Sequence, residues 1–362
     1  MQVVRDLDEA RWRRFVDGEP AGNVFQTPEM FEVFRRAAGH RPELWAALDG
    51  PDVAAVFTPV HVTAAGLPLP SMTSRAVAYG SILAERSERG ASAARLVLQR
   101  YRAAVGRRSL FTELRCLDDH DWLRPVLDGA GFTFERHLNY LVAVDRDPEE
   151  ILGTISRSTR KRIRRGLRAG DVQVAEVRDR AELGEWYRVL CGTYRHARVP
   201  VPDLSLFTAA FDVLVPRGMI GFFAARVGGV MAACSAELRY KDTVYGWYGG
   251  SDRSFGALAP NEILMWHVLE WSSRSGCRVY DFGGAGSPDE EYGVRDFKAK
   301  FGGRLVDFGR YTCVHARLRT SLGRLAYRAY RRLPGREPAR ATAAPAGERA
   351  DGPAAARRTA GG

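Results

Sequence analysis

The sequence predicts an α/β protein built from two similar units, each with helices packed on a mixed sheet. Its 362 residues exceed the usual size of one domain, so two units are the first expectation. Helical and strand patterns alternate along the chain, as they do in layered mixed sheets. A helix-helix-strand pattern occurs early in the chain and again after residue 145. We therefore expect one unit at 1–144 and a second at 145–333.

The first unit is predicted from cap and turn signals between apolar runs. Thr27 is a suitable N-cap and Pro28 suits the first position of a helix, so a helix is expected to start there. Asp49-Gly50 is a typical two-residue hairpin turn between strands. The expected elements are helices at 6–16, 28–38, 91–105 and 122–129, strands at 44–48, 53–62, 110–114 and 138–144, and a loop at 66–74.

A strongly basic helix is expected to open the second unit. Residues 147–150, Asp-Pro-Glu-Glu, favour a helix start because acidic residues suit a helix N-terminus. The continuation SRSTRKRIRRGLRAG contains seven basic residues and no acid. One interpretation is a solvated basic face. The other is a surface for phosphate, because like charges on one helix repel unless an anion pairs with them.

The rest of the second unit repeats the pattern of the first. His267 lies among apolar residues of a long amphipathic helix and is interpreted as a core histidine rather than a base. The last helix is basic and amphipathic, which suits either a packed position or an anionic membrane surface. The expected elements are helices at 181–194, 205–214, 261–275 and 316–333, strands at 220–226, 230–240, 243–249, 279–282 and 305–314, and a disordered tail at 334–362.

The stretch VYDFGGAGSPDEEYGVRDFKAKFGG, residues 279–303, joins a buried strand to a short helix. Phe297 and Phe301 are four residues apart, so they share one helical face and place Lys298 beside an apolar wall. A lysine there can bind an anion or stabilise developing negative charge. A surface lysine whose stem covers apolar residues is the alternative. In both cases we expect Lys298→Ala to change stability little.

Composition indicates an anionic partner without identifying it. The formal charge is +11 and the isoelectric point is near 9.7, which suits nucleic acid, an acidic membrane or a phosphorylated substrate. The five cysteines are far apart and form no Cys-x-x-Cys pair, as in reduced cytosolic proteins. No signal peptide or membrane-spanning run is predicted. We expect a cytoplasmic location, with peripheral contact at the inner face of the membrane as an open alternative.

The familiar motifs of nucleophilic, metal-dependent and nucleotide-hydrolysing enzymes are absent from the sequence, and one phosphate loop is a near match. Residues 253–259, Arg-Ser-Phe-Gly-Ala-Leu-Ala, lie between a strand and a helix, where acetyltransferases of the GNAT type bind the pyrophosphate of coenzyme A. Leu258 occupies a position that those enzymes keep small. We therefore expect a GNAT-like framework that has lost its coenzyme A site.

Four segments resemble the Fem family of aminoacyltransferases (FemABX), and the last two are specific at this spacing. They are Phe25-Gln26-Thr27-Pro28-Glu29, Arg160-Lys161-Arg162-Ile163-Arg164-Arg165, Asp281-Phe282-Gly283-Gly284 and Gly293-Val294-x-x-Phe297-Lys298-x-x-Phe301-Gly302. The resemblance covers most of the chain. It implies two tandem GNAT-like acyltransferase domains without the coiled-coil arm of many family members, since the chain contains no heptad run.

The same resemblance implies an activity and a set of site residues. The activity is transfer of an amino acid from aminoacyl-tRNA to a peptidoglycan precursor, either lipid II or a nucleotide-linked stem peptide, by a monomer without a cofactor or metal. Lys298 matches the functional lysine of the family. The implied substrate-binding residues are Tyr248, Arg35, Arg195, Arg198 and Phe297, and the tRNA-binding residues are Arg160, Lys161, Arg164 and Arg165.

Aminoacyl transfer from an ester to an amine is downhill, so positioning and oxyanion stabilisation can suffice. We expect Lys298 to stabilise charge on the ester or the leaving ribose oxygen, and no side chain stands out as a base. Two rival enzymes remain open: an N-acyltransferase that uses acyl-coenzyme A, and a tRNA-dependent enzyme that acts on a small molecule or polysaccharide. A basic protein that only binds RNA or membrane is the non-enzymatic alternative.

Overall fold

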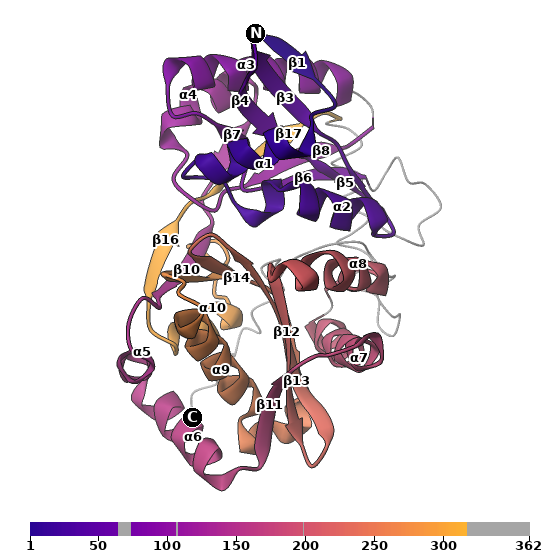
Figure 1. Cartoon of the computed structure of the whole chain (residues 1–362). Coiled ribbons are helices and arrows are strands. Elements are labelled where there is room, and N and C mark those ends of the chain that lie inside the picture. The colour runs from indigo at the N-terminus through magenta and orange to yellow at the C-terminus, as the bar shows by residue number, and fades with distance from the viewer. Residues whose placement is uncertain (64–73, 106–107, 198, 317–362) are drawn as a thin grey trace, which may run out of the picture.

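The computed structural model describes residues 1–63, 74–105, 108–197 and 199–316, and it contains two α/β units stacked on each other (Figure 1). The predicted C-terminal helix and tail, and nearly all of the predicted loop at 66–74, lie outside the described residues. Within the described part of the chain, no helix is long and apolar enough to cross a membrane.

The first unit has two sheets, with α3 packed on the four-stranded one and a core of aliphatic and aromatic side chains. The four-stranded sheet has the order β1-β3-β4-β7 and the six-stranded sheet the order β2-β5-β6-β8-β17-β9. Its strands are β1 (Gln2–Val4), β2 (His40–Pro42), β3 (Trp45–Asp49), β4 (Asp52–Phe57), β5 (Val60–Val62), β6 (Arg75–Tyr79), β7 (Leu83–Ala84), β8 (Phe111–Arg115), β9 (Thr133–Glu135) and β17 (Arg310–Val314). Its helices are α1 (Glu9–Gly18), η1 (Val24–Gln26), α2 (Pro28–Arg36), α3 (Glu88–Val105), η3 (Asp121–Leu123) and α4 (Arg124–Gly129).

Local signals explain where several of these elements begin and end. Thr27 Oγ1 accepts a hydrogen bond from the Met30 amide at 3.2 Å, so α2 starts at Pro28 as predicted. The predicted strand at 53–62 is two strands in different sheets. Pro59 lies between them and has no N–H to donate to a ladder, which explains why the strand is interrupted there.

The second unit is one seven-stranded sheet, order β11-β12-β13-β14-β15-β10-β16, covered on one face by α9 and on the other by α7 and α8. Its strands are β10 (Leu138–Ala143), β11 (Val172–Glu176), β12 (Ile220–Val227), β13 (Val230–Tyr240), β14 (Thr243–Ser251), β15 (Val279–Gly284) and β16 (Arg304–Asp307). Its helices are α5 (Pro148–Thr154), α6 (Arg157–Ala169), α7 (Arg180–Ala197), α8 (Leu204–Leu214), η4 (Val215–Arg217), η5 (Arg253–Leu258), α9 (Pro260–Arg274) and α10 (Gly293–Ala299).

Two strands differ from the predicted boundary at residue 144. The strand at 138–144 was expected to complete the first unit, yet β10 lies between β15 and β16 in the second sheet. The strand expected at 305–314 is two strands, and its second half, β17, pairs with β8 and β9 of the first unit. Gly309 separates the halves with a φ of 70°, which turns the chain from one sheet to the other. Apolar spacing predicts a strand but not the sheet that it joins.

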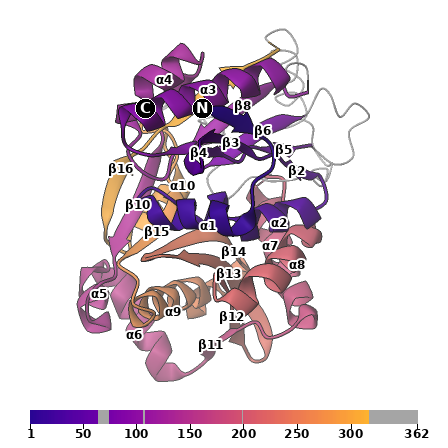
Figure 2. The ribbon, with the colours of Figure 1, turned by 45° about the horizontal axis from the view of Figure 1, so that its top comes forward.

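The two units share one apolar core, which fixes their relative positions. α2 of the first unit lies beside α8 of the second (Figure 2). Phe25 and Phe34 from the first unit belong to the same buried cluster as Trp186 and Phe207 from the second. The Ala38 amide also donates to Ser205 Oγ at 2.8 Å. A site formed between the units is therefore held by packing on both sides.

Candidate active site

The parallel strands β14 and β15 form a fork. They pair from Thr243 and Val279 as far as Tyr245 and Asp281, and then they separate. Beyond that point β14 continues to Ser251 along β13, whereas the end of β15 runs along β10. The backbone groups of residues 282–284 that face β14 therefore have no hydrogen-bond partners in that strand. Polar groups in such a position need other partners.

Lys298 of α10 supplies those partners. Its ammonium donates to the carbonyl oxygens of Phe282 at 2.7 Å, Gly283 at 3.3 Å and Gly284 at 2.6 Å. The side chain is only 4 % exposed. Burial lowers the pKa of the ammonium to about 8, and the nearby carboxylate of Asp281 opposes that shift.

This arrangement overturns the expectation that Lys298 contributes little to stability. The buried ammonium donates to three backbone carbonyl oxygens, and removing a buried donor from its acceptors is costly. The predicted apolar wall is present, since the Phe297 and Phe301 rings lie 5.1 Å apart and Phe301 is fully buried. The expectation of a direct catalytic contact stays a prediction.

Asp281 lies at the point where the fork opens, and sequence reasoning assigned it no role. Its Oδ1 accepts a hydrogen bond from the Gly283 amide at 2.7 Å, and Asn139 Nδ2 lies 3.2 Å from Oδ2. Burial raises the pKa of this carboxyl to about 6, although both hydrogen bonds and the Lys298 charge act in the opposite direction. A pKa near 6 suits a group that accepts a proton at neutral pH. The only sequence signal was an aspartate placed before two glycines at a strand end.

Asp281 and Tyr245 line a cavity of about 410 Å³ between the two units. Its other walls come from residues 19–25 at the end of α1, residues 117–122 before α4, and the turn between β13 and β14. Lys241 in that turn donates to the Val16 and Glu19 carbonyl oxygens, so the turn is tied to the first unit. The ionisable lining groups are mostly acidic: Glu19, Asp118, Asp119, Asp242 and Asp281, against Arg86 and Lys241.

A second buried acid lies behind the fork, and it was also missed. Tyr280 donates from its hydroxyl to Glu237 Oε2 at 3.0 Å. Burial raises the pKa of Glu237 to about 7, and the Tyr280 hydrogen bond opposes that shift. Neither residue lines the cavity between the units, so we interpret this pair as a support of the fork.

The substrate-binding residues implied by the family resemblance do not form one cluster with Lys298. Tyr248 of β14 is buried, and its ring lies 6.1 Å from the ring of Tyr194 on α7. Arg195 follows Tyr194 and is exposed, so the structure brings these two predicted regions together. Arg35 is on α2 of the first unit, where it forms an ion pair with Glu32 at 2.5 Å. Arg198 lies outside the described residues.

The basic helix is α6, and it is partly compensated by acids from other elements. Arg162 pairs with Glu262 at 2.8 Å, and Arg164 pairs with Glu149 at 3.0 Å. The basic segment itself contains no acidic residue, because these two carboxylates belong to α9 and α5. Within the described part of the chain, the exposed cations of α6 without an ion pair are Arg157, Lys161, Arg165 and Arg168. Arg160 donates to the Gly153 carbonyl at 2.7 Å.

The loop at residues 253–259 folds as η5 and leads directly into α9. Its Gly256 carbonyl accepts a hydrogen bond from Arg162 of α6 at 2.7 Å, so the basic helix is fastened to this loop. Leu258 is 37 % exposed, and Ala259 has a φ of 58° at the start of α9. The loop therefore presents a leucine and a neighbouring arginine where the expected motif has small residues.

Comparisons with known proteins agree with this fold. Residues 155–298 match the family model described as "Acetyltransferase (GNAT) domain". The crystal structure of FemX has a TM-score of 0.68 and 15 % identity over 89 % of this chain and 99 % of that chain. The structure of L-PGS from Bacillus licheniformis has a TM-score of 0.57 and 12 % identity over 90 % of this chain and 99 % of that one.

A tandem GNAT protein from the clavulanic acid biosynthesis pathway has a TM-score of 0.54 and 11 % identity over 87 % of this chain and 98 % of that chain. No curated protein matches the sequence. The predicted architecture of two tandem GNAT-like units is confirmed, and the resemblance to the Fem family holds at the level of the fold. The described part of the second unit carries no coiled-coil arm.

Proposed function

We propose that this protein is an acyltransferase that moves an amino acid from aminoacyl-tRNA to an amine. The observation that carries the proposal is the fork, where Asp281 opens into a cavity between the units and Lys298 holds the separated end of β15. FemX and L-PGS share this fold along nearly their whole lengths. Aminoacyl transfer is the activity that the Fem resemblance implies.

The donor is proposed to be tRNA rather than coenzyme A. In the loop before α9, Leu258 stands at a position that coenzyme A enzymes keep small, and Arg162 engages the Gly256 carbonyl. The same arginine belongs to a helix with an exposed row of cations, which suits phosphates of an RNA acceptor stem. Aminoacyl-tRNA then serves as a substrate, and no cofactor is required.

The acceptor is proposed to be an amine on a peptidoglycan precursor, either lipid II or a nucleotide-linked stem peptide. The acidic lining of the cavity between the units suits a positively charged amino group. Arg35, Arg195 and Arg198 are the proposed contacts for precursor phosphates, and Tyr248 and Phe297 are proposed to contact the substrates. An acceptor on an anionic lipid would bring the protein to the inner face of the membrane.

The proposed reaction needs one proton acceptor and little else. Asp281 takes one proton from the ammonium of the acceptor, and the free amine attacks the ester carbon. A C–N bond forms, the bond between that carbon and the ribose oxygen breaks, and a second amine proton goes to the departing ribose oxygen. Lys298 acts by holding the carbonyl groups of residues 282–284 and by placing a positive charge near Asp281.

An N-acyltransferase that uses acyl-coenzyme A is the second candidate, because residues 155–298 match the GNAT domain model. Incubation with charged tRNA or acetyl-coenzyme A, each with lipid-linked and nucleotide-linked precursors, separates the two. We expect mass spectrometry to find an added aminoacyl group only with tRNA. Tight binding of acetyl-coenzyme A in calorimetry, with acetylation of an acceptor, would replace the proposal with the second candidate.

The donor proposal also predicts a change in salt dependence. Lys161→Gln with Arg165→Gln removes two exposed cations of α6, so binding to tRNA should weaken. The slope of log affinity against log salt should become shallower by about 0.9 for each phosphate that the protein no longer neutralises. Arg95→Gln with Arg100→Gln is the matched control, because both arginines are exposed on α3 of the first unit. Equal changes in both double variants would show a nonspecific charge effect.

A further inference from the structure

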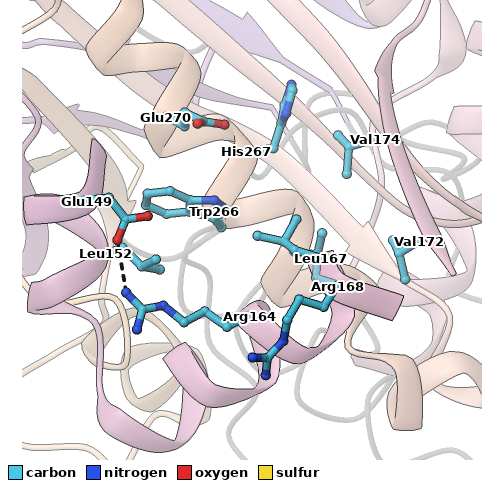
Figure 3. Close-up of a pocket in the computed structure, with 11 residues that line it drawn as sticks. Glu149, Leu152, Arg164, Leu167, Arg168, Val172, Val174, Trp266, His267 and Glu270 are labelled. Carbon is cyan, nitrogen blue, oxygen red and sulfur yellow. Dashed lines mark hydrogen bonds and ion pairs between the residues drawn. The ribbon is translucent and has the colours of Figure 1, made fainter. Parts of the chain in front are cut away.

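A second cavity lies in the second unit and shares no lining residue with the cavity at the fork. It has a volume of about 530 Å³ and is enclosed by α5, α6, β11 and α9 (Figure 3). Its apolar lining includes Trp266, Ile263, Val172 and Val174. Trp266 is only 5 % exposed, so the indole forms the floor of the cavity rather than its rim.

Leu167 marks the mouth of this cavity. The side chain is 51 % exposed on a helix whose other exposed side chains are mainly basic. Ile163 of the same helix supplies the burial against α9, so Leu167 is left half-exposed at the entrance. An apolar group at the entrance to an apolar cavity is what a ligand with a flat, uncharged part would contact.

The rim of the cavity carries both signs of charge. Arg164 and Glu149 pair across one side at 3.0 Å, as Figure 3 shows. Glu270 of α9 also lines the cavity, and its carboxylate pairs with Arg274 at 2.8 Å. Arg168 is exposed and has no ion pair within the described part of the chain. His267 also lines the cavity, and burial lowers the pKa of its imidazole, so it is neutral at pH 7.

The cation row of α6 starts at this cavity and leads away from it. Arg157, Lys161, Arg165 and Arg168 lie within one side of the helix because they are spaced by four, four and three residues. The row extends about 16 Å, from the rise of 1.5 Å per residue. Phosphates of one RNA strand can follow such a row, with the end at Arg168 beside the cavity.

We propose that this cavity accepts one unpaired nucleobase of an RNA strand whose phosphates lie along α6. The inference rests on the proposed function, since it concerns how the tRNA donor is held. The apolar floor and Leu167 would contact the flat faces and edge of the base, while the carboxylates of Glu149 and Glu270 can accept hydrogen bonds from its amino group. A hydrocarbon chain fits less well, because two carboxylates stand on the rim.

The test uses the full chain and two labelled RNA hexamers, one of adenosine and one with abasic sites throughout. Fluorescence anisotropy should show the adenosine hexamer binding roughly 10-fold more tightly, as expected when one base is stacked in a cavity. Leu167→Gln should abolish most of that preference and leave binding of the abasic hexamer unchanged. Leu167 is exposed, so this variant should keep its melting temperature.

Two further variants separate base contacts from phosphate contacts. Arg165→Gln lies outside the cavity lining, so it should weaken binding of both hexamers by the same factor and keep the preference. Val174→Trp fills the cavity and should reduce the preference as Leu167→Gln does. Equal affinity for both hexamers in the unmodified protein would overturn the proposal, and so would a preference that survives in both cavity variants.

The proposed function and this site can fail separately. A base preference that depends on Leu167, without aminoacyl transfer from charged tRNA, would reject the proposed function and keep the RNA site. Transfer from charged tRNA without any base preference would keep the function and reject the site. Binding of anionic phospholipid vesicles that requires Leu167, with no RNA binding, would assign the cavity to lipid and overturn the proposal.

Discussion

In the described part of each unit, one pair of parallel strands is connected through a helix, and the two pairs end differently. In the first unit, β6 and β8 remain paired through Tyr79 and Arg115, where β8 ends. In the second unit, β14 and β15 separate after three pairs, and six residues of β14 continue without β15. We call the end of the β6–β8 pair the closed end, because the two strands stay paired there. We call the end of the β14–β15 pair the open end, because the two strands separate there.

Different charged groups stabilise the two strand ends. At the closed end, Arg115 donates to Glu113 at 2.5 Å, and Arg310 of β17 lies 3.6 Å from the same carboxylate. Burial alone would raise the pKa of Glu113, but the neighbouring arginines hold it below the ordinary value. At the open end, Lys298 bonds to backbone oxygens and the carboxyl of Asp281 keeps a raised pKa. The ion pairs of Glu113 therefore stabilise the closed end. At the fork, the carboxyl of Asp281 has a pKa at which it can accept a proton near neutral pH.

The largest change in stability is expected at the closed end. Glu113→Gln removes the negative charge between two largely buried arginines, Arg115 and Arg310, and should lower the free energy of unfolding by about 3 kcal/mol. Urea denaturation measures this. Glu149→Gln removes an exposed partner of Arg164 and should cost less than about 1 kcal/mol. Similar losses in the two variants would show that the closed end is not held by its ion pair.

The next effect concerns activity at the open end. Asp281→Asn keeps the size of the side chain but cannot take a proton, so turnover should fall by about 10²-fold. In the unmodified protein, kcat/KM should rise as pH increases through about 6, because Asp281 must be ionised to accept the proton. In the variant, kcat/KM should no longer fall as the pH decreases below about 6. If kcat/KM of the variant still falls in that pH range, Asp281 is not the proton acceptor.

The stability of the Asp281→Asn variant tests whether Asp281 acts as a proton acceptor or only supports the fork. The pKa of Asp281 is raised in the folded protein, so its ionised form is disfavoured by folding above about pH 6 and this cost disappears at lower pH. Asp281→Asn should therefore unfold at the same or a higher urea concentration at pH 7.5. A marked loss of stability at that pH would indicate that the carboxylate mainly supports the fork.

A smaller effect is expected for the lysine that supports the fork. Lys298→Met keeps the apolar stem but leaves the carbonyl groups of residues 282–284 without their donor, so unfolding should become easier by roughly 2 kcal/mol. Lys300→Met, on an exposed neighbour, should change stability by less than about 0.5 kcal/mol. Both values come from denaturant midpoints. No difference between the two variants would restore the expectation of a surface lysine.

Lys298→Arg tests what the ammonium does in the reaction. A planar guanidinium cannot reproduce the three hydrogen bonds to successive carbonyl groups, so Lys298→Arg should keep little of the turnover of the unmodified protein. A turnover close to that of the unmodified protein would mean that only the positive charge matters. Thermal unfolding of the same variant shows whether the lost activity follows lost structure.

Local sequence determined most of the elements of this protein. Thr27 and Pro28 fixed a helix start because they satisfy free N–H groups and a helical φ without help from the rest of the chain. The spacing of Phe297 and Phe301 predicted the apolar wall beside Lys298, and the row of arginines predicted an exposed basic helix. The repeated order of elements predicted the tandem fold. The helix start, the apolar wall and the basic helix each depend on residues within a few positions of one another, and the tandem fold depends only on the order of such elements.

Only the tertiary structure decided which strands pair and which charges meet. β10 and β17 join sheets that their spacing does not specify, because pairing depends on residues more than 100 positions away. That pairing opens the fork, directs Lys298 to three carbonyl groups and buries Asp281. The pKa of Asp281 then rises because water is excluded by packing, which is a property of the folded surroundings rather than of the aspartate in its sequence.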